Sequence, residues 1–232
     1  MTIMSAEDPS YVRWRSLLAT QDLVVIGVEF RNAGGRLGNS PFPAGLNDCA
    51  SATKWVFDNK RELNISSIII SGESGGGNLS IATALKAKKE NWLNQINGVY
   101  ACCPYISGLY EKKPANLVSL RENDDYLINC DQMAVLACLY DPNGKNEKNP
   151  LAWPYHATEQ DLHGLPPHFI WTNELDPLRD EGINFYRLLR RANVEAQCRV
   201  LSGTIHGTDI MVLSCPEVSL ETARSIAAFT RD

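Results

Sequence analysis

A serine flanked by glycines stands where an apolar run meets a helix-forming segment. The apolar run is Ile68–Ile70, the turn is Gly72–Gly76 with Ser74 at its centre, and helix-forming residues occupy 79–89. The pattern is G-x-S-x-G, which on a strand, turn and helix exposes the serine Oγ for nucleophilic attack. Glycines two positions before and after the serine would remove Cβ atoms that collide in so tight a turn.

Other interpretations of this turn have to be weighed. The pattern arises by chance in roughly one chain in ten of this length, and Ser74 would then only cap the next helix. The glycine spacing does not fit the dinucleotide-binding pattern G-x-G-x-x-G, and no Lys-Ser/Thr pair follows to make a phosphate-binding P-loop. The strand before the turn and the helix after it favour a nucleophile.

An acid and a base follow two later apolar runs. Asp176 comes shortly after the predicted strand His168–Thr172, and His206 comes shortly after the predicted strand Ala196–Leu201. In parallel sheets, ligands bind beyond the carboxyl ends of the strands, where these side chains would meet Ser74. The order Ser, Asp, His along the chain is that of the α/β-hydrolase catalytic triad.

Each member of this predicted triad has a chemical task. Ser74 becomes a nucleophile only when a base takes its proton, and His206 would be that base and later the acid for the leaving alcohol. Asp176 would fix the imidazole tautomer and stabilise the imidazolium. The backbone N–H of Gly75, directly after the nucleophile, would donate to the oxyanion.

The competing residues fit these tasks less well. His168 lies inside a predicted strand, and His156 and His163 fall in an irregular region. Asp180 is typical of a helix start rather than of a triad acid. We assign Glu73, next to the serine, a structural hydrogen-bonding role and not that of the base.

The elements that must position these residues alternate between strand and helix. The predicted strands are Leu23–Phe30, Ile68–Ser71, Gly98–Cys103, His168–Thr172 and Ala196–Leu201. The predicted helices are Pro9–Thr20, Pro43–Asn59, Leu79–Lys89, Asp131–Tyr140, Asp180–Ala192 and Val218–Thr230. This order predicts a single α/β domain over 1–232, with a mostly parallel sheet and helices on both faces. Residues 105–165 are less regular, and we expect a substrate-pocket or cap-like insertion over one end of the sheet.

Composition bounds the partners. The chain has 232 residues with 44% hydrophobic and 21% charged residues and a net charge of −5, so no basic patch points to nucleic acid. The longest apolar runs are strand-sized, and the N-terminus lacks a signal-peptide pattern, which predicts a cytoplasmic protein without a membrane span. The seven cysteines show no metal-ligand spacing, and Cys102 and Cys103 are interpreted as buried strand residues. We therefore expect no metal and no cofactor.

Five segments together resemble the hormone-sensitive-lipase-like carboxylesterases. They are Gly72–Leu79 around the nucleophile, Asp176–Gly182 around the acid, Phe42–Gly45 with Asp48, Gly164–Pro167, and His206-Gly207. The resemblance spans essentially the whole chain. It implies an α/β-hydrolase fold and serine esterase activity without metal or cofactor, usually on short-chain esters.

The sequence departs from this family in one respect. The family carries an upstream His-Gly-Gly-Gly segment that completes the oxyanion hole, and it would stand just before Met1. The resemblance also implies a strand between Leu23–Phe30 and Ile68–Ser71, and its loss would leave backbone groups of the sheet unpaired. We therefore expect an N-terminally shortened chain with impaired activity, in which a homodimer partner would fill the gap.

The sequence thus predicts a serine carboxylester hydrolase that acts on short-chain esters through an acyl-enzyme. The alternative is a non-catalytic ligand-binding protein, or an inactive shortened one, on a hydrolase scaffold, because one fold hosts many functions. The complete triad argues against this alternative, and the missing glycine-rich segment favours it.

Overall fold

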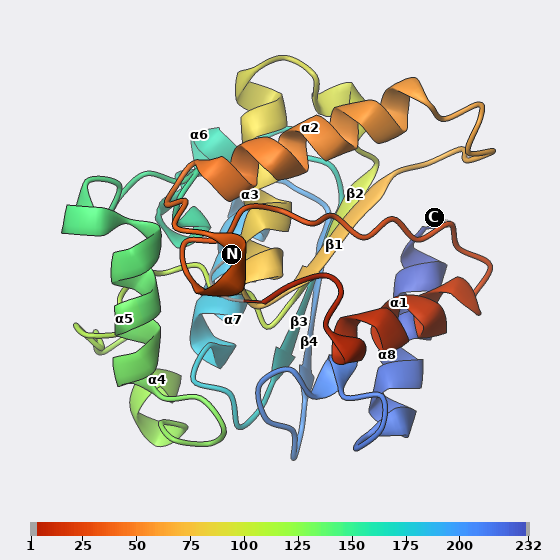
Figure 1. Cartoon of the computed structure of the whole chain (residues 1–232). Coiled ribbons are helices and arrows are strands. Elements are labelled where there is room, and N and C mark those ends of the chain that lie inside the picture. Colours follow the sequence, from red (N-terminus) through yellow and green to blue (C-terminus); the bar gives the residue numbers. More distant parts are fainter. Residues whose placement is uncertain (1–3, 231–232) are drawn as a thin grey trace.

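A parallel β-sheet lies at the centre of the computed structural model, which describes residues 4–230 apart from the side chain of Leu37. Its strands are β1 (Ile69–Glu73), β2 (Gly98–Cys102), β3 (His168–Asn173) and β4 (Ala196–Leu201), in the order β1-β2-β3-β4 (Figure 1). The strands are connected through helices, so the predicted α/β class is confirmed. The ends of the predicted domain, residues 1–3 and 231–232, lie outside the described residues.

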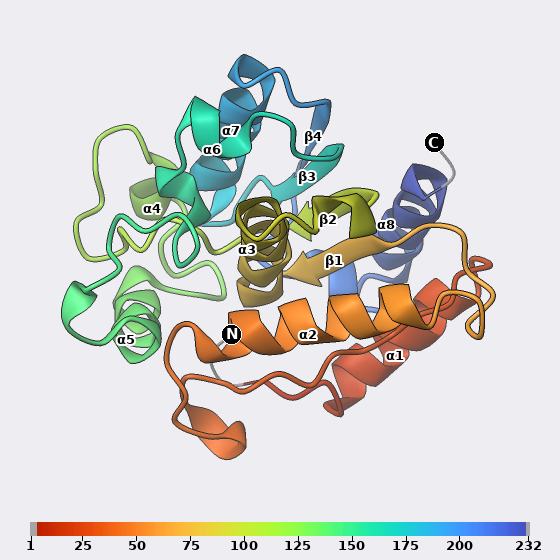
Figure 2. The same cartoon turned by 90° about the horizontal axis from the view of Figure 1, so that it is seen from above.

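Helices cover both faces of the sheet because the two central strands are apolar on both faces. Val99, Ala101 and Ile170 face α2 (Ala44–Asp58), α3 (Gly75–Lys89) and α7 (Arg179–Arg191). Tyr100 and Trp171 lie on the opposite face, against α1 (Pro9–Ala19) and α8 (Pro216–Phe229). Figure 2 shows the two helical layers on either side of the strands. Side chains that alternate between two apolar layers are typical of buried parallel strands.

The segment Leu23–Phe30 is not a strand of this sheet, so that prediction is wrong. The sheet ends at β1, and the segment crosses the surface without regular structure. Leu23 and Val25 pack towards α1 and α8, whereas Val24 and Ile26 are exposed. An apolar run becomes a strand only when a neighbouring strand accepts its backbone hydrogen bonds, and none in the described part of the chain lies beside it.

The remaining predicted elements are present with shifted boundaries. The strand before the serine extends to Glu73, and the helix after it begins directly at Gly75, which makes the turn tighter than predicted. Cys103 lies one residue beyond β2 and is buried, as its neighbour Cys102 is.

Residues 105–165 contain no strand and connect β2 to β3. They hold α4 (Ser119–Glu122), α5 (Cys130–Tyr140) and α6 (Glu159–Leu162), with two 3₁₀ turns, η3 (Pro142–Gly144) and η4 (Pro154–His156). Figure 2 shows α4 and α5 on the side towards which β1 points.

Three further 3₁₀ turns lie elsewhere in the chain: η1 (Gly35–Leu37), η2 (Leu93–Gln95) and η5 (Thr208–Ile210). Across residues 4–230, no helix combines the length and apolar character needed to span a bilayer.

Candidate active site

Ser74 occupies a strained turn at the carboxyl end of β1. Its backbone has φ 53° and ψ −115°, a conformation that non-glycine residues rarely adopt. Two backbone hydrogen bonds hold it to the end of β2 and the segment that follows, from Ser74 N to the Cys102 carbonyl (2.9 Å) and from Tyr105 N to the Ser74 carbonyl (3.1 Å). The strain is therefore maintained by the neighbouring strand, as expected of a nucleophile elbow.

The two glycines of the motif serve different steric needs. A Cβ on Gly72 would lie 2.3 Å from the Gly76 carbonyl oxygen, a backbone atom that cannot move aside. A Cβ on Gly76 would meet nothing within 4 Å. The prediction that both positions avoid a collision is thus right for Gly72 and wrong for Gly76, because the close approach is that of the Gly76 backbone to Gly72.

Asp176 and His206 form a buried hydrogen-bonded pair. Asp176 Oδ2 lies 2.8 Å from His206 Nδ1, and Asp176 is fully buried. The other carboxylate oxygen of Asp176 accepts a hydrogen bond from Leu178 N at 2.9 Å. With its carboxylate fixed in this way, Asp176 accepts the proton on Nδ1, so that Nε2 carries the lone pair whenever the imidazole is neutral.

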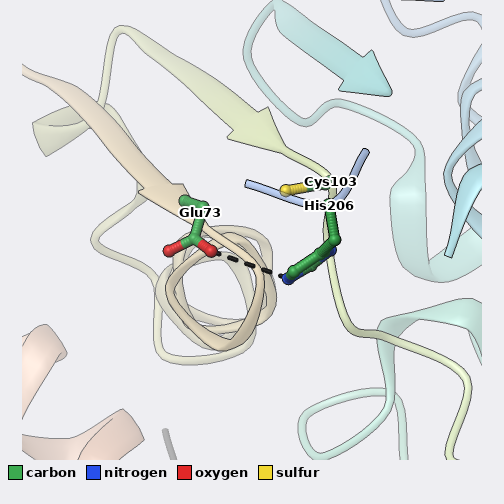
Figure 3. A group of neighbouring side chains, drawn as sticks. All are labelled: Glu73, Cys103 and His206. Atoms are coloured by element: carbon green, nitrogen blue, oxygen red, sulfur yellow. Dashed lines mark ion pairs between the residues drawn. The ribbon is translucent and has the colours of Figure 1, made fainter. Parts of the chain in front are cut away.

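The second ring nitrogen of His206, Nε2, faces Glu73. Nε2 lies 3.6 Å from Glu73 Oε1, while Glu73 Oε2 accepts a hydrogen bond from the Tyr11 hydroxyl at 2.9 Å. Figure 3 shows Glu73 and His206 pointing towards each other, with Cys103 beside them. Ser74 Oγ forms no hydrogen bond to His206 or to any other group in the described part of the chain. The structure thus brings the three predicted triad members to one end of the sheet but joins only two of them.

Burial and negative neighbours act in opposite directions on His206. Burial disfavours the imidazolium, but the Asp176 carboxylate, through its charge and hydrogen bond, and Glu73 outweigh it and raise the pKa of His206 to about 9. A base that accepts the Ser74 proton must first be neutral. The arrangement therefore favours general-base action under alkaline conditions.

The predicted oxyanion donor stands at the first position of α3. The N–H of Gly75 makes no hydrogen bond within residues 4–230, as expected for the open amino end of a helix. The partial positive charge of the helix end adds to this donor. This amide is the candidate oxyanion donor that the described residues offer beside Ser74.

The competing residues lie elsewhere and have other partners. His168 is buried in β3, where burial lowers its pKa to about 4, and its Nδ1 lies 2.7 Å from the Pro166 carbonyl. His156 Nε2 faces the Ser107 carbonyl at 2.8 Å, and Asp180 accepts a hydrogen bond from Ser119 N, also at 2.8 Å. None of them forms a hydrogen bond with Ser74, so the choice of His206 and Asp176 stays a prediction.

Sequence reasoning missed two neighbours of the candidate base. The sequence suggests only a structural hydrogen-bonding role for Glu73; the side chain accepts a hydrogen bond from Tyr11, but it also faces His206 Nε2. Cys103 was interpreted as a strand residue, although its thiol lies within 4.8 Å of ligand atoms of Glu73 and His206. The position of Cys103 in the sequence could have revealed it, because the residue follows the carboxyl end of β2. The other candidate groups lie at this same edge of the sheet.

A strained serine elbow, a buried Asp–His pair and a parallel sheet together define the α/β-hydrolase class. Residues 4–210 match the family model described as alpha/beta hydrolase fold, and the chain belongs to this family.

Similar proteins of known structure or activity show which members of this family the chain resembles. The structure superposes on brefeldin A esterase, described as a bacterial homologue of human hormone-sensitive lipase, with a TM-score of 0.96 and 46% identity over 99% of this chain and 65% of that one. Carboxylesterase NlhH of Mycobacterium tuberculosis is 31% identical over 215 residues, which are 90% of this chain and 63% of that protein. An arylesterase of Saccharolobus solfataricus is 31% identical over 222 residues, 94% of this chain and 67% of that protein. The predicted resemblance to hormone-sensitive-lipase-like carboxylesterases is confirmed, and the chain spans about two thirds of the length of these relatives.

Proposed function

We propose that this chain is a serine carboxylester hydrolase that cleaves short-chain esters through an acyl-enzyme. The observation that carries the proposal is the buried Asp176–His206 pair, 2.8 Å apart, at the same end of the sheet as Ser74 on its strained turn. The esterase names of the relatives support the same reaction class.

In the proposed mechanism the imidazole of His206 moves towards Ser74. Neutral Nε2 takes the Ser74 Oγ proton as Oγ attacks the ester carbonyl, and Asp176 stabilises the imidazolium that forms. The same proton then passes to the leaving alcohol. Water, activated by His206, releases the acid from Ser74 in the second half of the cycle.

Stabilisation of the oxyanion falls to Gly75 N–H in this mechanism. This amide would donate one hydrogen bond to the oxyanion, and one such donor typically contributes about 10²–10³ to kcat. Asn123 of the 105–165 insertion donates hydrogen bonds to the Glu174 and Asp176 carbonyls beside the candidate acid. In this proposal the 105–165 insertion forms the acyl or alcohol pocket.

The test is hydrolysis of p-nitrophenyl acetate and p-nitrophenyl butyrate by this chain beside Ser74→Ala. Release of p-nitrophenol that Ser74→Ala abolishes would support the mechanism, and release that persists in this variant would rule it out. A fluorophosphonate probe supplies a second readout, since it should label wild-type Ser74 covalently and leave Ser74→Ala unmodified.

Ligand binding without catalysis is the second candidate, and the missing hydrogen bond between Ser74 and His206 favours it. A folded wild-type chain that neither releases p-nitrophenol nor reacts with the probe, yet is stabilised against heat by an ester, would support this candidate.

A further inference from the structure

We propose that Glu73, Cys103 and His206 form a binding site for a thiophilic divalent cation such as Zn²⁺, and that the bound ion blocks the base of the proposed esterase. The oxygen, sulfur and nitrogen ligand atoms of these residues lie within 4.8 Å of one another. Figure 3 shows the three side chains converging from the end of β1, the residue after β2 and the loop after β4. Carboxylate, thiolate and imidazole are the ligands that zinc takes in proteins.

The spacing is close to that of a tetrahedral site. Zinc bonds of about 2.0–2.3 Å place neighbouring ligand atoms about 3.3–3.6 Å apart. Glu73 Oε1 and His206 Nε2 are 3.6 Å apart, and the Cys103 thiol, within 4.8 Å of its two neighbours, moves closer to them when it binds the ion. Three protein ligands leave the fourth position to water.

Two of the ligands are already oriented by outer partners. His206 binds Asp176 through Nδ1, which is the carboxylate–histidine arrangement that directs Nε2 to a metal. Glu73 is held by the Tyr11 hydroxyl through Oε2, which leaves Oε1 free. The Cys103 thiol is free and buried and forms no hydrogen bond within residues 4–230.

Binding is balanced by proton release. The proton of the Cys103 thiol and any proton on His206 Nε2 pass to solvent. The ion then binds the lone pairs of the thiolate sulfur and of Nε2. The cation compensates the negative charge of Glu73, Asp176 and the new thiolate. With its Nε2 lone pair on the metal, His206 cannot take the Ser74 proton; this consequence alone rests on the proposed function.

The direct test uses Co²⁺ as the probe, because a thiolate-to-cobalt charge-transfer band reports the sulfur ligand without any activity. Titration of the metal-free full chain should give one equivalent with this band, and Zn²⁺ should displace it while Mg²⁺ should not. Cys103→Ala should remove the band, and the matched control Cys102→Ala, which deletes the adjacent buried thiol, should retain it. No band in the wild type, or a band that survives Cys103→Ala, would overturn the site.

A second variant keeps the test decisive if Cys103→Ala does not fold. Glu73→Gln keeps the side-chain size and an acceptor for Tyr11 but loses the charged ligand. We expect its cobalt dissociation constant to rise at least about tenfold, since even outer partners of a metal contribute about 10–100-fold. An unchanged dissociation constant in a variant with a wild-type circular-dichroism spectrum would contradict the three-ligand site.

The inhibitory consequence has its own readout. Zn²⁺ should suppress p-nitrophenyl acetate release in the wild type, a chelator should restore it, and the release by Cys103→Ala should not respond to Zn²⁺. Suppression that is equal in both chains would contradict the inhibitory part of the proposal. A cobalt band in a chain without any esterase activity would refute the proposed function and leave the metal site supported.

Discussion

At the scale of single residues, backbone strain at Ser74 determines what the site can do. The residue keeps φ 53° because Cys102 and Tyr105 bind its backbone on both sides and because Gly72 leaves room for the Gly76 carbonyl. A serine in relaxed geometry would continue the strand or cap the helix. The strained turn instead places Ser74 at the carboxyl end of β1, the edge where a parallel sheet binds its ligands.

Alanine at the two motif glycines should have opposite effects. We expect Gly72→Ala to destabilise the fold by about 1–3 kcal/mol or more, because its Cβ would overlap backbone atoms of Gly76. The matched variant Gly76→Ala places a methyl in open space at the second position of α3 and should be neutral or stabilising by up to about 1 kcal/mol. Urea unfolding of the two variants measures the change in the free energy of unfolding. If Gly72→Ala is no less stable than Gly76→Ala, the predicted collision at Gly72 is contradicted.

At the scale of elements, β1 is the edge strand of the sheet, and the segment 23–30 does not pair with it in the described residues. The backbone N–H groups of this segment make no hydrogen bonds within residues 4–230, whereas β3 is paired with a strand on each side. Side chains hold the segment in place: Leu23 and Val25 pack towards α1 and α8, and Glu29 accepts hydrogen bonds from Ser5 Oγ and Ala6 N. Side-chain contacts alone protect backbone amides poorly, so this part of the fold should open locally.

Hydrogen exchange measures this difference directly. Amides of residues 23–30 should exchange orders of magnitude faster than those of β3, because exchange there needs no opening of a strand ladder. Strand β4 is the control, since it is also an edge strand but is paired with β3. Protection of 23–30 equal to that of β4 would mean that the segment finds a strand partner in solution.

At the scale of the whole molecule, a buried acid connects α7 to the 105–165 insertion and couples stability to pH. Glu181 of α7 accepts hydrogen bonds from Ile106 N at 2.7 Å and from the Tyr110 hydroxyl at 3.1 Å, and its second oxygen has no partner within residues 4–230. Burial raises the pKa of Glu181 to about 8 from its usual value near 4.5. Between these values the folded chain keeps a proton that the unfolded chain has released.

The free energy of unfolding should therefore fall as the pH rises from about 4.5 to about 8. A single proton contributes up to about 1.4 kcal/mol per pH unit in this window. The variant Glu181→Gln, which cannot titrate, should show a shallower dependence than the wild type by that amount, whatever its absolute stability. Urea unfolding of both chains at about pH 5.5 and pH 7.5 compares the slopes, and parallel pH profiles would refute a raised pKa.

Much of the fold followed from patterns that are local in the sequence. Alternating apolar runs and amphipathic segments predicted all four strands and six of the helices, because burial against a sheet requires such periodicity. Leu23–Phe30 failed because apolar character reports burial preference and not whether a partner strand is present. The extent of the turn at Ser74 also depended on Gly76 approaching Gly72, a contact that no residue pattern contains.

The sequence by itself determined the α/β class, the serine motif and the choice of Ser74, Asp176 and His206, because residue types and strand ends are written in its order. Only the tertiary structure decided which of these groups touch. It joined His206 to Asp176 at 2.8 Å and turned Nε2 towards Glu73 at 3.6 Å, with the Cys103 thiol beside them. Residues 73, 103 and 206 have no ligand spacing along the chain, and they meet because parallel strands bring their carboxyl ends to one edge.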